Sequence, residues 1–299
     1  QPASFTGTIG FKPTYGRISR YGLLAYASSF DQIGPFTTTV EDSALLTSIM
    51  CGKDEYDSTA LQEGAPDLSL KFDPNKKLKI AYISDCLESK GIDSEIVNRT
   101  KEIIASLQAE GHTVEPVSFP FLDVMVPTYY VLTTAEASSN LARYSGVHFG
   151  YQSPTAEGVE NTYKKSRSEG FGEEVKRRIM LGTFVLSHGY YDAYYTKGQK
   201  VRRVIQDKTK AIFEDYDLIL TPTTPSTAFE IGKNDKDPIT MYLQDIFTVQ
   251  ANLAGNPAIS LPIGNHSNGL PFGIQLMGKP FQEADLFAFS DYLMAANKN

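Results

Sequence analysis

A complete strand–helix–strand pattern occurs at residues 78–117, which read LKIAYISDCLESKGIDSEIVNRTKEIIASLQAEGHTVEPV. The apolar run 78–84 is typical of a short buried strand, and 113–117 returns to strand-like sequence after a helix. Asp93 is positioned to cap that helix, and Gly111 follows its last turn, where a left-handed glycine commonly ends a helix. One such unit predicts an α/β core with at least some parallel strand pairing.

Sequence on both sides of this unit supports the same fold class. Residues 131–213 have mostly helical periodicity, and helices are also expected from Thr39 to Gly52 and at 284–296. The remaining expected strands are short apolar runs near the end of the chain, at 218–222, 258–262 and 272–277. We therefore predict an α/β fold with a central mixed β-sheet flanked by helices and a helical layer inserted. The first residues, QPAS, are expected to lead directly into a strand.

Composition narrows the class of protein. The chain has 299 residues, of which 21% are charged and 41% hydrophobic, as in a soluble globular protein. A formal net charge of −7 argues against binding of nucleic acid by this chain alone. No apolar run reaches the length of a membrane span. Two cysteines, Cys51 and Cys86, are too few for a disulfide framework, so we expect a reducing, cytoplasmic environment.

Motifs for cofactors are missing from the sequence. No GxxxxGK[ST] loop occurs, and no GxGxxG follows an expected strand, so ATP binding by this chain has no sequence support. The four histidines are scattered and do not have the spacing of metal ligands, so the sequence does not predict a zinc site. We therefore predict no metal and no cofactor in this chain.

Two charged residues interrupt apolar helical stripes. Arg178 lies three residues after Val175, and Asp245 lies four residues before Val249. A buried charge must be paired or must line a cleft, because leaving it unpaired costs several kcal/mol or more. Periodicity alone favours a structural ion pair or a cap over a role in substrate binding.

Two further patterns allow more than one reading. Residues 190–195, YYDAYY, precede several basic residues, which could indicate RNA stacking. A helix whose tyrosines pack inward and whose lysines and arginines face solvent explains the pattern equally well, and we favour that interpretation. Ser4, Ser28, Ser29 and Lys12 could suggest a Ser–Lys pair, but their spacing does not establish a base within reach of a nucleophile. We interpret Lys12 as structural.

Several blocks resemble the amidase signature family. They are GFKPTYGRISRYG at 10–22, DQIGP at 31–35, TVED at 39–42, NLAGNPAISLPIG at 252–264 and GLPFGIQLMG at 269–278. Within that family, three longer blocks look most like the glutaminase subunits of tRNA-dependent amidotransferases. They are RYGLLAYASSFDQIGP at 20–35, TTAEASSNLARYSGVHFG at 133–150 and GFGEEVKRRIMLGTFVLSHGYYDAYY at 170–195.

The resemblance implies that residues 1–299 are the C-terminal portion of one amidase-signature domain, truncated at its N-terminus. Family members cleave an amide with a Ser–cis-Ser–Lys triad, which would lie upstream of Gln1 together with the glycines that hold the oxyanion. No catalytic residue is therefore assigned within 1–299, and we expect this chain alone to be inactive.

The resemblance also implies part of a glutamine pocket. The family's tyrosine, arginine and aspartate match the pair Tyr129-Tyr130, from which we choose Tyr129, together with Arg178 and Asp245. The chemistry fits, because a guanidinium suits the α-carboxylate of glutamine and a carboxylate suits its α-ammonium. The two charges that interrupt the apolar stripes are the same two positions, so the resemblance favours substrate binding.

The implied function is hydrolysis of glutamine to supply ammonia for conversion of Glu-tRNA(Gln) to Gln-tRNA(Gln). The implied partners are amidotransferase subunits B and C in a heterotrimer, in which ATP and magnesium bind to the partner and tRNA is contacted only through it. No membrane association is expected. Two alternatives remain: another amidase-signature amide hydrolase, and a catalytically inactive fragment that serves only in the assembly of the subunits.

Overall fold

In the computed structural model, which describes residues 1–232, 241 and 243–297, the strands form one sheet in the order β2-β1-β6-β7-β5-β3-β4. Pairing is parallel where β3 meets β4 and β5, and antiparallel elsewhere, so the predicted mixed sheet is confirmed. The strands are β1 Ile9–Lys12, β2 Phe36–Thr37, β3 Lys79–Ile83, β4 Thr113–Val117, β5 Leu218–Pro222, β6 Ala258–Asn265 and β7 Pro271–Met277.

The predicted strand–helix–strand unit is confirmed with both of its helix signals. Helix α4 (Ser94–Ala109) connects β3 to β4, which pair in parallel from Lys79 opposite Thr113 to Ile83 opposite Val117. The Asp93 carboxylate accepts a hydrogen bond from Glu95 N at 2.8 Å and so caps the helix. Gly111 adopts φ 90° directly after the C-cap, a conformation that costs glycine little.

The first residues differ from the prediction. Pro2–Thr6 form the short helix α1, and the strand begins only at Ile9. Pro2 occupies the first helical position, where its fixed φ and missing N–H are tolerated. Gly7 then ends the helix in the left-handed conformation, with φ 67°. Local capping signals therefore outweigh the strand-like composition of this segment.

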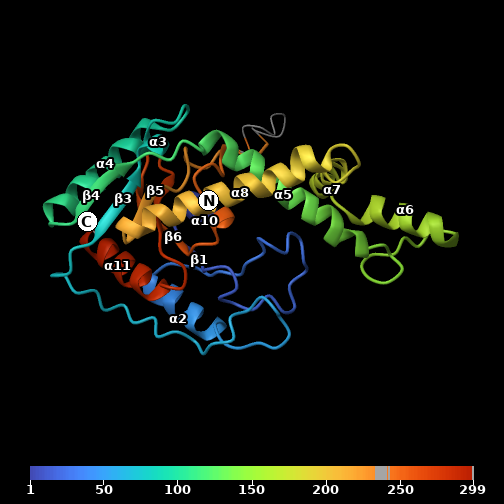
Figure 1. Cartoon of the computed structure of the whole chain (residues 1–299), viewed down its shortest axis with the longest axis horizontal. Helices are drawn as coiled ribbons and strands as arrows, with labels where there is room; N and C mark the ends of the chain where they lie inside the picture. The colour runs from blue at the N-terminus through green and yellow to red at the C-terminus, as the bar shows by residue number, and fades with distance from the viewer. Residues whose placement is uncertain (233–240, 242, 298–299) are drawn as a thin grey trace. The chain divides into compact units, whose positions relative to one another are not determined.

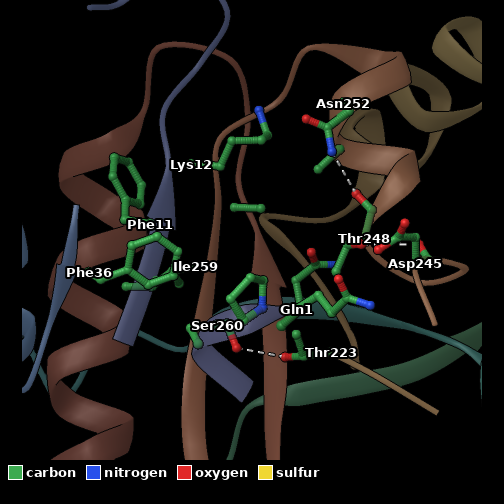
Figure 2. A pocket seen from close by; sticks show the side chains of 16 residues that line it. Gln1, Phe11, Lys12, Phe36, Thr223, Asp245, Thr248, Asn252, Ile259 and Ser260 are labelled. Carbon is green, nitrogen blue, oxygen red and sulfur yellow. Dashed lines mark hydrogen bonds between the residues drawn. The ribbon is translucent and has the colours of Figure 1, made fainter. Parts of the chain in front are cut away.

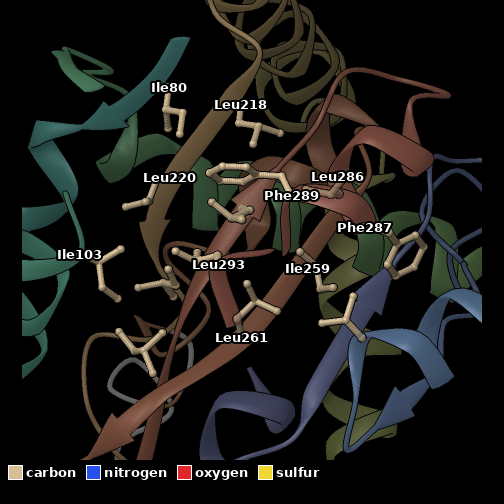
Figure 3. Packing of buried hydrophobic residues seen from close by; sticks show 14 of the residues in the cluster. Ile80, Ile103, Leu218, Leu220, Ile259, Leu261, Leu286, Phe287, Phe289 and Leu293 are labelled. Atoms are coloured by element: carbon tan, nitrogen blue, oxygen red, sulfur yellow. The ribbon is translucent and has the colours of Figure 1, made fainter. Parts of the chain in front are cut away.

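One face of the sheet carries the main hydrophobic core. Helices α2 (Val40–Met50), α4 and α11 (Glu283–Ala296) contribute apolar side chains to it. Figure 3 shows Ile259 and Leu261 of β6 packed with Leu286 and Phe289 of α11. Since side chains alternate along a strand, Ser260 between them belongs to the opposite face. This alternation decides which residues are available to line a site.

The chain packs as two compact units. The sheet unit comprises Gln1–Tyr21, Gln32–Val126 and Val204–Asn299, and the helical unit comprises Gly22–Asp31 and Pro127–Arg203. Figure 1 shows the long helices that follow β4, which confirm the predicted helical insertion before β5. These helices are α5 Leu122–Asn140, α6 Gly158–Gly170, α7 Glu173–Val185 and α8 Lys197–Asp215.

Shorter helices complete the connections. They are α3 Ser84–Leu87, the 3-10 turn η1 Leu141–Arg143, the π-helical turn η2 Asp192–Thr196 and α10 Val249–Ala254. Within the described part of the chain, no helix combines the length and the apolar character needed to cross a bilayer.

Candidate functional site

Arg178 lies in the middle of α7, in the helical unit, with three close neighbours. Its Nε donates to Oε1 of Glu174 at 2.8 Å, one turn earlier, and its Nη1 donates to the hydroxyl of Tyr26 at 3.2 Å. The guanidinium carbon lies 5.4 Å from the centre of the Tyr130 ring. Burial by itself lowers the pKa of Arg178, but the hydrogen bonds to Glu174 and Tyr26 outweigh it, so the pKa is raised. Arg178 is therefore a permanent cation.

Much of the hydrogen-bonding capacity of Arg178 is unused. A guanidinium carries five N–H donors, and those that bond to Glu174 and Tyr26 account for two of them within the described residues. The side chain is 25% exposed, so its outer edge reaches solvent. An edge with free parallel donors is suited to two-point binding of a carboxylate.

The predicted tyrosine, Tyr129, packs against the ring that faces this cation. On α5, the ring of Tyr129 packs edge-on against Phe30 at 5.6 Å and against Tyr130 at 5.3 Å between centroids. The ring facing the guanidinium is that of Tyr130. The helical unit thus brings both tyrosines of the pair together with Arg178, with Tyr130 in direct contact and Tyr129 one ring further away.

Tyr26 is a site residue that the sequence patterns did not single out. It precedes α5 by about a hundred residues, yet it belongs to the same unit as Arg178. The available signal was its position inside the block 20–35, one of the three that resemble glutaminase subunits. Nothing in the spacing of that block indicates which helix the tyrosine would contact.

Asp245, the third predicted residue, belongs to the sheet unit, where it lines a cavity of about 300 Å³ (Figure 2). Its backbone carbonyl accepts from the N–H and the hydroxyl of Thr248, at 2.9 and 3.0 Å. That turn leads into α10 and holds Asp245 at the cavity wall. The polar side chains that share the cavity come from β1, β6, β7, α10 and the end of β5, and include Lys12, Thr223, Asn252, Ser260 and Gln275.

Strand alternation supplies the polar side chains of the cavity, whose lining also includes apolar residues such as Phe36 and Ala251. In β6, Ile259 and Leu261 point into the apolar core, so Ser260 points to the other face, where its hydroxyl bonds to Thr223 at 2.9 Å. Gln275 of β7 lies on the same face and donates to the carbonyl of Phe247 at 3.0 Å. Buried polar groups that satisfy one another in this way give the cavity a fixed shape.

Lys12 does not pair with any of the serines that could have been its partner. Its Nζ donates to the carbonyl of Pro13 at 2.9 Å and to Oε1 of Gln32 at 3.1 Å. Burial lowers its pKa to about 7, against the opposing attraction of Glu283. The serine hydroxyls bond elsewhere, Ser4 to Thr224 and Gly273, Ser28 to Asn140, and Ser29 to Glu136 and Arg202. Among the described residues, no lysine donates to a serine hydroxyl.

The prediction that the tyrosines of residues 190–195 pack inward is wrong for three of them. Tyr190, Tyr191 and Tyr194 are 42–45% exposed rather than packed inward. Two of them pack on Phe184 of α7, Tyr190 at 4.3 Å and Tyr194 at 5.7 Å between centroids. Tyr194 lies in the π-helical turn, where the regular helical period does not apply, whereas Tyr190 and Tyr191 precede that turn. The aromatic rings form a surface cluster.

A metal centre finds no support in the part of the chain that the structure describes, because no three His, Cys, Asp or Glu side chains gather to hold an ion. Both cysteines are free thiols, and burial raises the pKa of Cys51 to about 11.

The amidase family model matches residues 1–287, and the chain belongs to the amidase family. Its relatives include the A subunit of the glutamyl-tRNA(Gln) amidotransferase of Staphylococcus saprophyticus, 52% identical over 96% of this chain. The corresponding protein of Persephonella marina is 51% identical over 97% of the chain. The chain spans about 59% and 60%, respectively, of the length of these two relatives.

Solved structures agree with this assignment. The A subunit of the glutamyl-tRNA(Gln) amidotransferase of Thermotoga maritima superposes with a TM-score of 0.77 at 45% identity, covering 97% of this chain and 58% of that one. The peptide amidase of Stenotrophomonas maltophilia gives a TM-score of 0.73 at 22% identity, covering 99% of this chain and 60% of that one, which demonstrates a shared fold alone. The mixed sheet flanked by helices is thus the amidase-signature fold.

Proposed function

We propose that this chain is part of the glutamine-hydrolysing subunit of a glutamyl-tRNA(Gln) amidotransferase. The observation that carries the proposal is its identity of about one half, along nearly the whole chain, to subunits of that enzyme. In this proposal residues 1–299 form the C-terminal portion of one amidase-signature domain. The whole protein hydrolyses glutamine to glutamate, and the ammonia converts Glu-tRNA(Gln) to Gln-tRNA(Gln).

Each proposed substrate contact has a chemical reason. Arg178 offers free donors on a charged guanidinium, which suit the α-carboxylate of glutamine. Asp245 offers a carboxylate at the wall of a cavity, which suits the α-ammonium. Tyr129 belongs to the aromatic cluster beside Arg178 and supplies a hydroxyl and an apolar surface.

The partners proposed are amidotransferase subunits B and C, with which the whole protein forms a heterotrimer in the cytoplasm. ATP, magnesium and tRNA belong to the partner in this proposal. The acidic charge of −7 and the lack of a phosphate-binding loop in this sequence support that division of labour.

Catalysis requires a nucleophile that residues 1–299 do not supply in this proposal. The support is geometric, since Lys12 bonds to Pro13 and Gln32 rather than to a serine. Purified residues 1–299 are therefore expected to release no ammonia from glutamine above background. Turnover that a serine substitution within these residues abolishes would contradict this expectation.

The function is tested with the full-length protein, in complex with its partner subunits, by comparing glutamine with an amide that has neither α-substituent. Glutamine should be hydrolysed efficiently, whereas pentanamide, which lacks both α-charges, should be a poor substrate. Ammonia release with equal kcat/KM for the two amides would overturn the glutamine assignment and favour a general amide hydrolase.

A further inference from the structure

A ten-residue segment, Gly22–Asp31, belongs to the helical unit although it precedes the rest of that unit by about a hundred residues. We call it the strap. It touches both residues of this unit that the family resemblance assigns to glutamine: its Tyr26 bonds to Arg178, and its Phe30 packs against Tyr129. No property of a single helix explains why one remote segment should contact both.

We propose that the strap is a positioning element of the substrate site, and that the hydroxyl of Tyr26 orients the guanidinium of Arg178 for the carboxylate of an α-amino acid amide. This inference rests on the proposed function, since it assigns Arg178 to the substrate carboxylate. Tyr26 acts through Arg178 and is therefore a positioning residue rather than a catalytic one.

The backbone of Tyr26 is fixed on both sides of the residue. Its N–H donates to the carboxylate of Asp31 at 2.9 Å, and that carboxylate also accepts from Ala27 N at 3.0 Å. Its carbonyl accepts from Nδ2 of Asn140 at 3.0 Å, and Asn140 lies at the end of α5. The phenol therefore projects from a rigid turn, which limits where its hydroxyl can lie.

A second anchor follows at Ser29. The carboxylate of Glu136 accepts from the Ser29 N–H at 2.8 Å, and Arg202 donates to the Ser29 carbonyl at 3.0 Å. Arg202 also lies over the ring of Phe30, with its guanidinium carbon 4.2 Å from the centroid. Charged groups from α5 and α8 thus hold the strap, and charge-assisted hydrogen bonds are the strong ones.

The anchors matter because they position Tyr26. Among the described residues, the Tyr26 hydroxyl is the only polar partner that Arg178 has outside its own helix. Glu174 belongs to α7, is 43% exposed, and also pairs with Arg177. An exposed carboxylate shared by two arginines holds a guanidinium loosely. The Tyr26 hydroxyl bonds to Nη1 from another segment, and the Tyr130 ring supports the plane. Together these contacts fix the plane and leave Nη2 available.

The expected consequence is a defect restricted to substrates that carry a carboxylate. Two-point binding of a carboxylate by arginine depends on the guanidinium plane, so a guanidinium free to rotate binds it less well. An amide without a carboxylate gains nothing from that orientation. The strap therefore contributes to selectivity for α-amino acid amides.

The test is Tyr26→Phe in the full-length protein, in complex with its partner subunits. We expect KM for glutamine to rise about 5- to 10-fold, the equivalent of one hydrogen bond, with kcat within about twofold. Hydrolysis of 4-aminobutanamide, which is glutamine without its carboxylate, should be unchanged. Tyr144→Phe is the matched control, because Tyr144 belongs to the same unit and its hydroxyl makes no hydrogen bond to a described residue.

Two further variants keep the test decisive. Asn140→Ala loosens the Tyr26 carbonyl without altering the ring, and should raise KM for glutamine in the same direction. Tyr26→Phe added to Arg178→Ala should have no further effect, since Tyr26 acts only through Arg178. If Tyr26→Phe impairs both amides equally, or adds to Arg178→Ala, the positioning role is wrong.

The outcomes separate this inference from the function on which it rests. If wild-type protein hydrolyses glutamine, Arg178→Ala impairs it and Tyr26→Phe does not, the strap inference alone is overturned. If wild-type protein does not distinguish glutamine from 4-aminobutanamide, the glutamine assignment is overturned and the strap inference with it.

Discussion

Arg17 and Glu283, separated by 266 residues in the chain, form a buried ion pair in which Nη2 and Oε2 lie 3.0 Å apart. The other carboxylate oxygen accepts from the N–H and the hydroxyl of Thr14, at 3.2 and 2.6 Å. The pair joins the segment after β1 to the start of α11, two regions in or beside which the amidase-signature blocks occur. Both side chains are almost inaccessible, at 6% and 1% exposed.

We predict that Glu283→Ala destabilises the full-length protein by about 3–5 kcal/mol, because it leaves the Arg17 guanidinium buried without its partner. The double variant Arg17→Met/Glu283→Met should lose less than the sum of the two single variants. Asp285→Asn is the matched control on the same helix: its pair with Lys76 is exposed and 3.8 Å long, and should contribute less than about 1 kcal/mol. Denaturant unfolding measures all of these variants, and equal losses for Glu283→Ala and Asp285→Asn would contradict the prediction.

The stability of the protein should depend on His112 below neutral pH. Its Nδ1 accepts a hydrogen bond from Leu78 N at 3.1 Å, so protonation there would break the bond. Burial, with a contribution from Lys77, lowers the pKa of His112 below its ordinary value of 6.5. The unfolded state therefore binds more protons, and the free energy of unfolding falls as pH drops through about 6.5.

His112→Gln should accordingly reduce the slope of unfolding free energy against pH in this window, measured by urea denaturation between about pH 5 and 7. His148→Gln is the control, since His148 is exposed. Parallel pH profiles for wild type and His112→Gln would show that the imidazole does not titrate differently on folding.

Gly182 allows α7 to approach α5 closely. A Cβ at this position would lie 1.9 Å from the carbonyl oxygen of Thr134, a backbone atom that cannot yield without moving its helix. Gly182→Ala should therefore cost more than about 2 kcal/mol, despite the better helix propensity of alanine. Gly198→Ala is the comparison, because its added Cβ would meet the Leu132 and Val131 side chains at 3.2–3.3 Å.

We expect Gly198→Ala to change stability by less than about 1 kcal/mol, since side chains can shift by the few tenths of an ångström required. Thermal unfolding of the full-length protein compares the two variants. Equal effects would mean that the helical unit relaxes around residue 182.

Charge removal at the proposed substrate contacts should impair use of glutamine without loss of the fold. In the full-length protein, Arg178→Ala and Asp245→Ala should each lower kcat/KM for glutamine about 10- to 150-fold, the equivalent of a charge-assisted hydrogen bond of roughly 1.5–3 kcal/mol. Arg177→Ala is the matched control, because Arg177 adjoins Arg178 but is 58% exposed. Unchanged kcat/KM in both variants would return these residues to purely structural roles.

Much of the fold could be predicted from local signals in the sequence. The unit at 78–117 could be predicted because each of its signals, the apolar run at 78–84, the cap at Asp93 and the glycine at 111, acts on the residues directly beside it. The helix at 284–296 was recoverable because Leu286, Phe289 and Leu293 repeat at helical spacing and are buried. The structural preferences that such local patterns produce depend little on the rest of the chain.

Local signals were insufficient where two of them compete or where the period changes. Pro2 and Gly7 make a helix of residues whose composition suggested a strand. Tyr190, Tyr191 and Tyr194 are exposed in and just before the π-helical turn at 192–196, where the sequence pattern favoured inward packing. In both cases hydrogen bonding and backbone conformation outweigh the average preference of the side chains.

What the sequence by itself determined is therefore the fold class and the order of most elements. Only the tertiary structure decided that β1 pairs with β6, some 250 residues later. It alone also decided that Tyr26 contacts Arg178 of α7 rather than a residue of another helix. The physical reason is that such pairings are non-local: each depends on closing a long loop and on many weak contacts made at once. The spacing of residues along the chain does not reveal such pairings, and the candidate site is built from them.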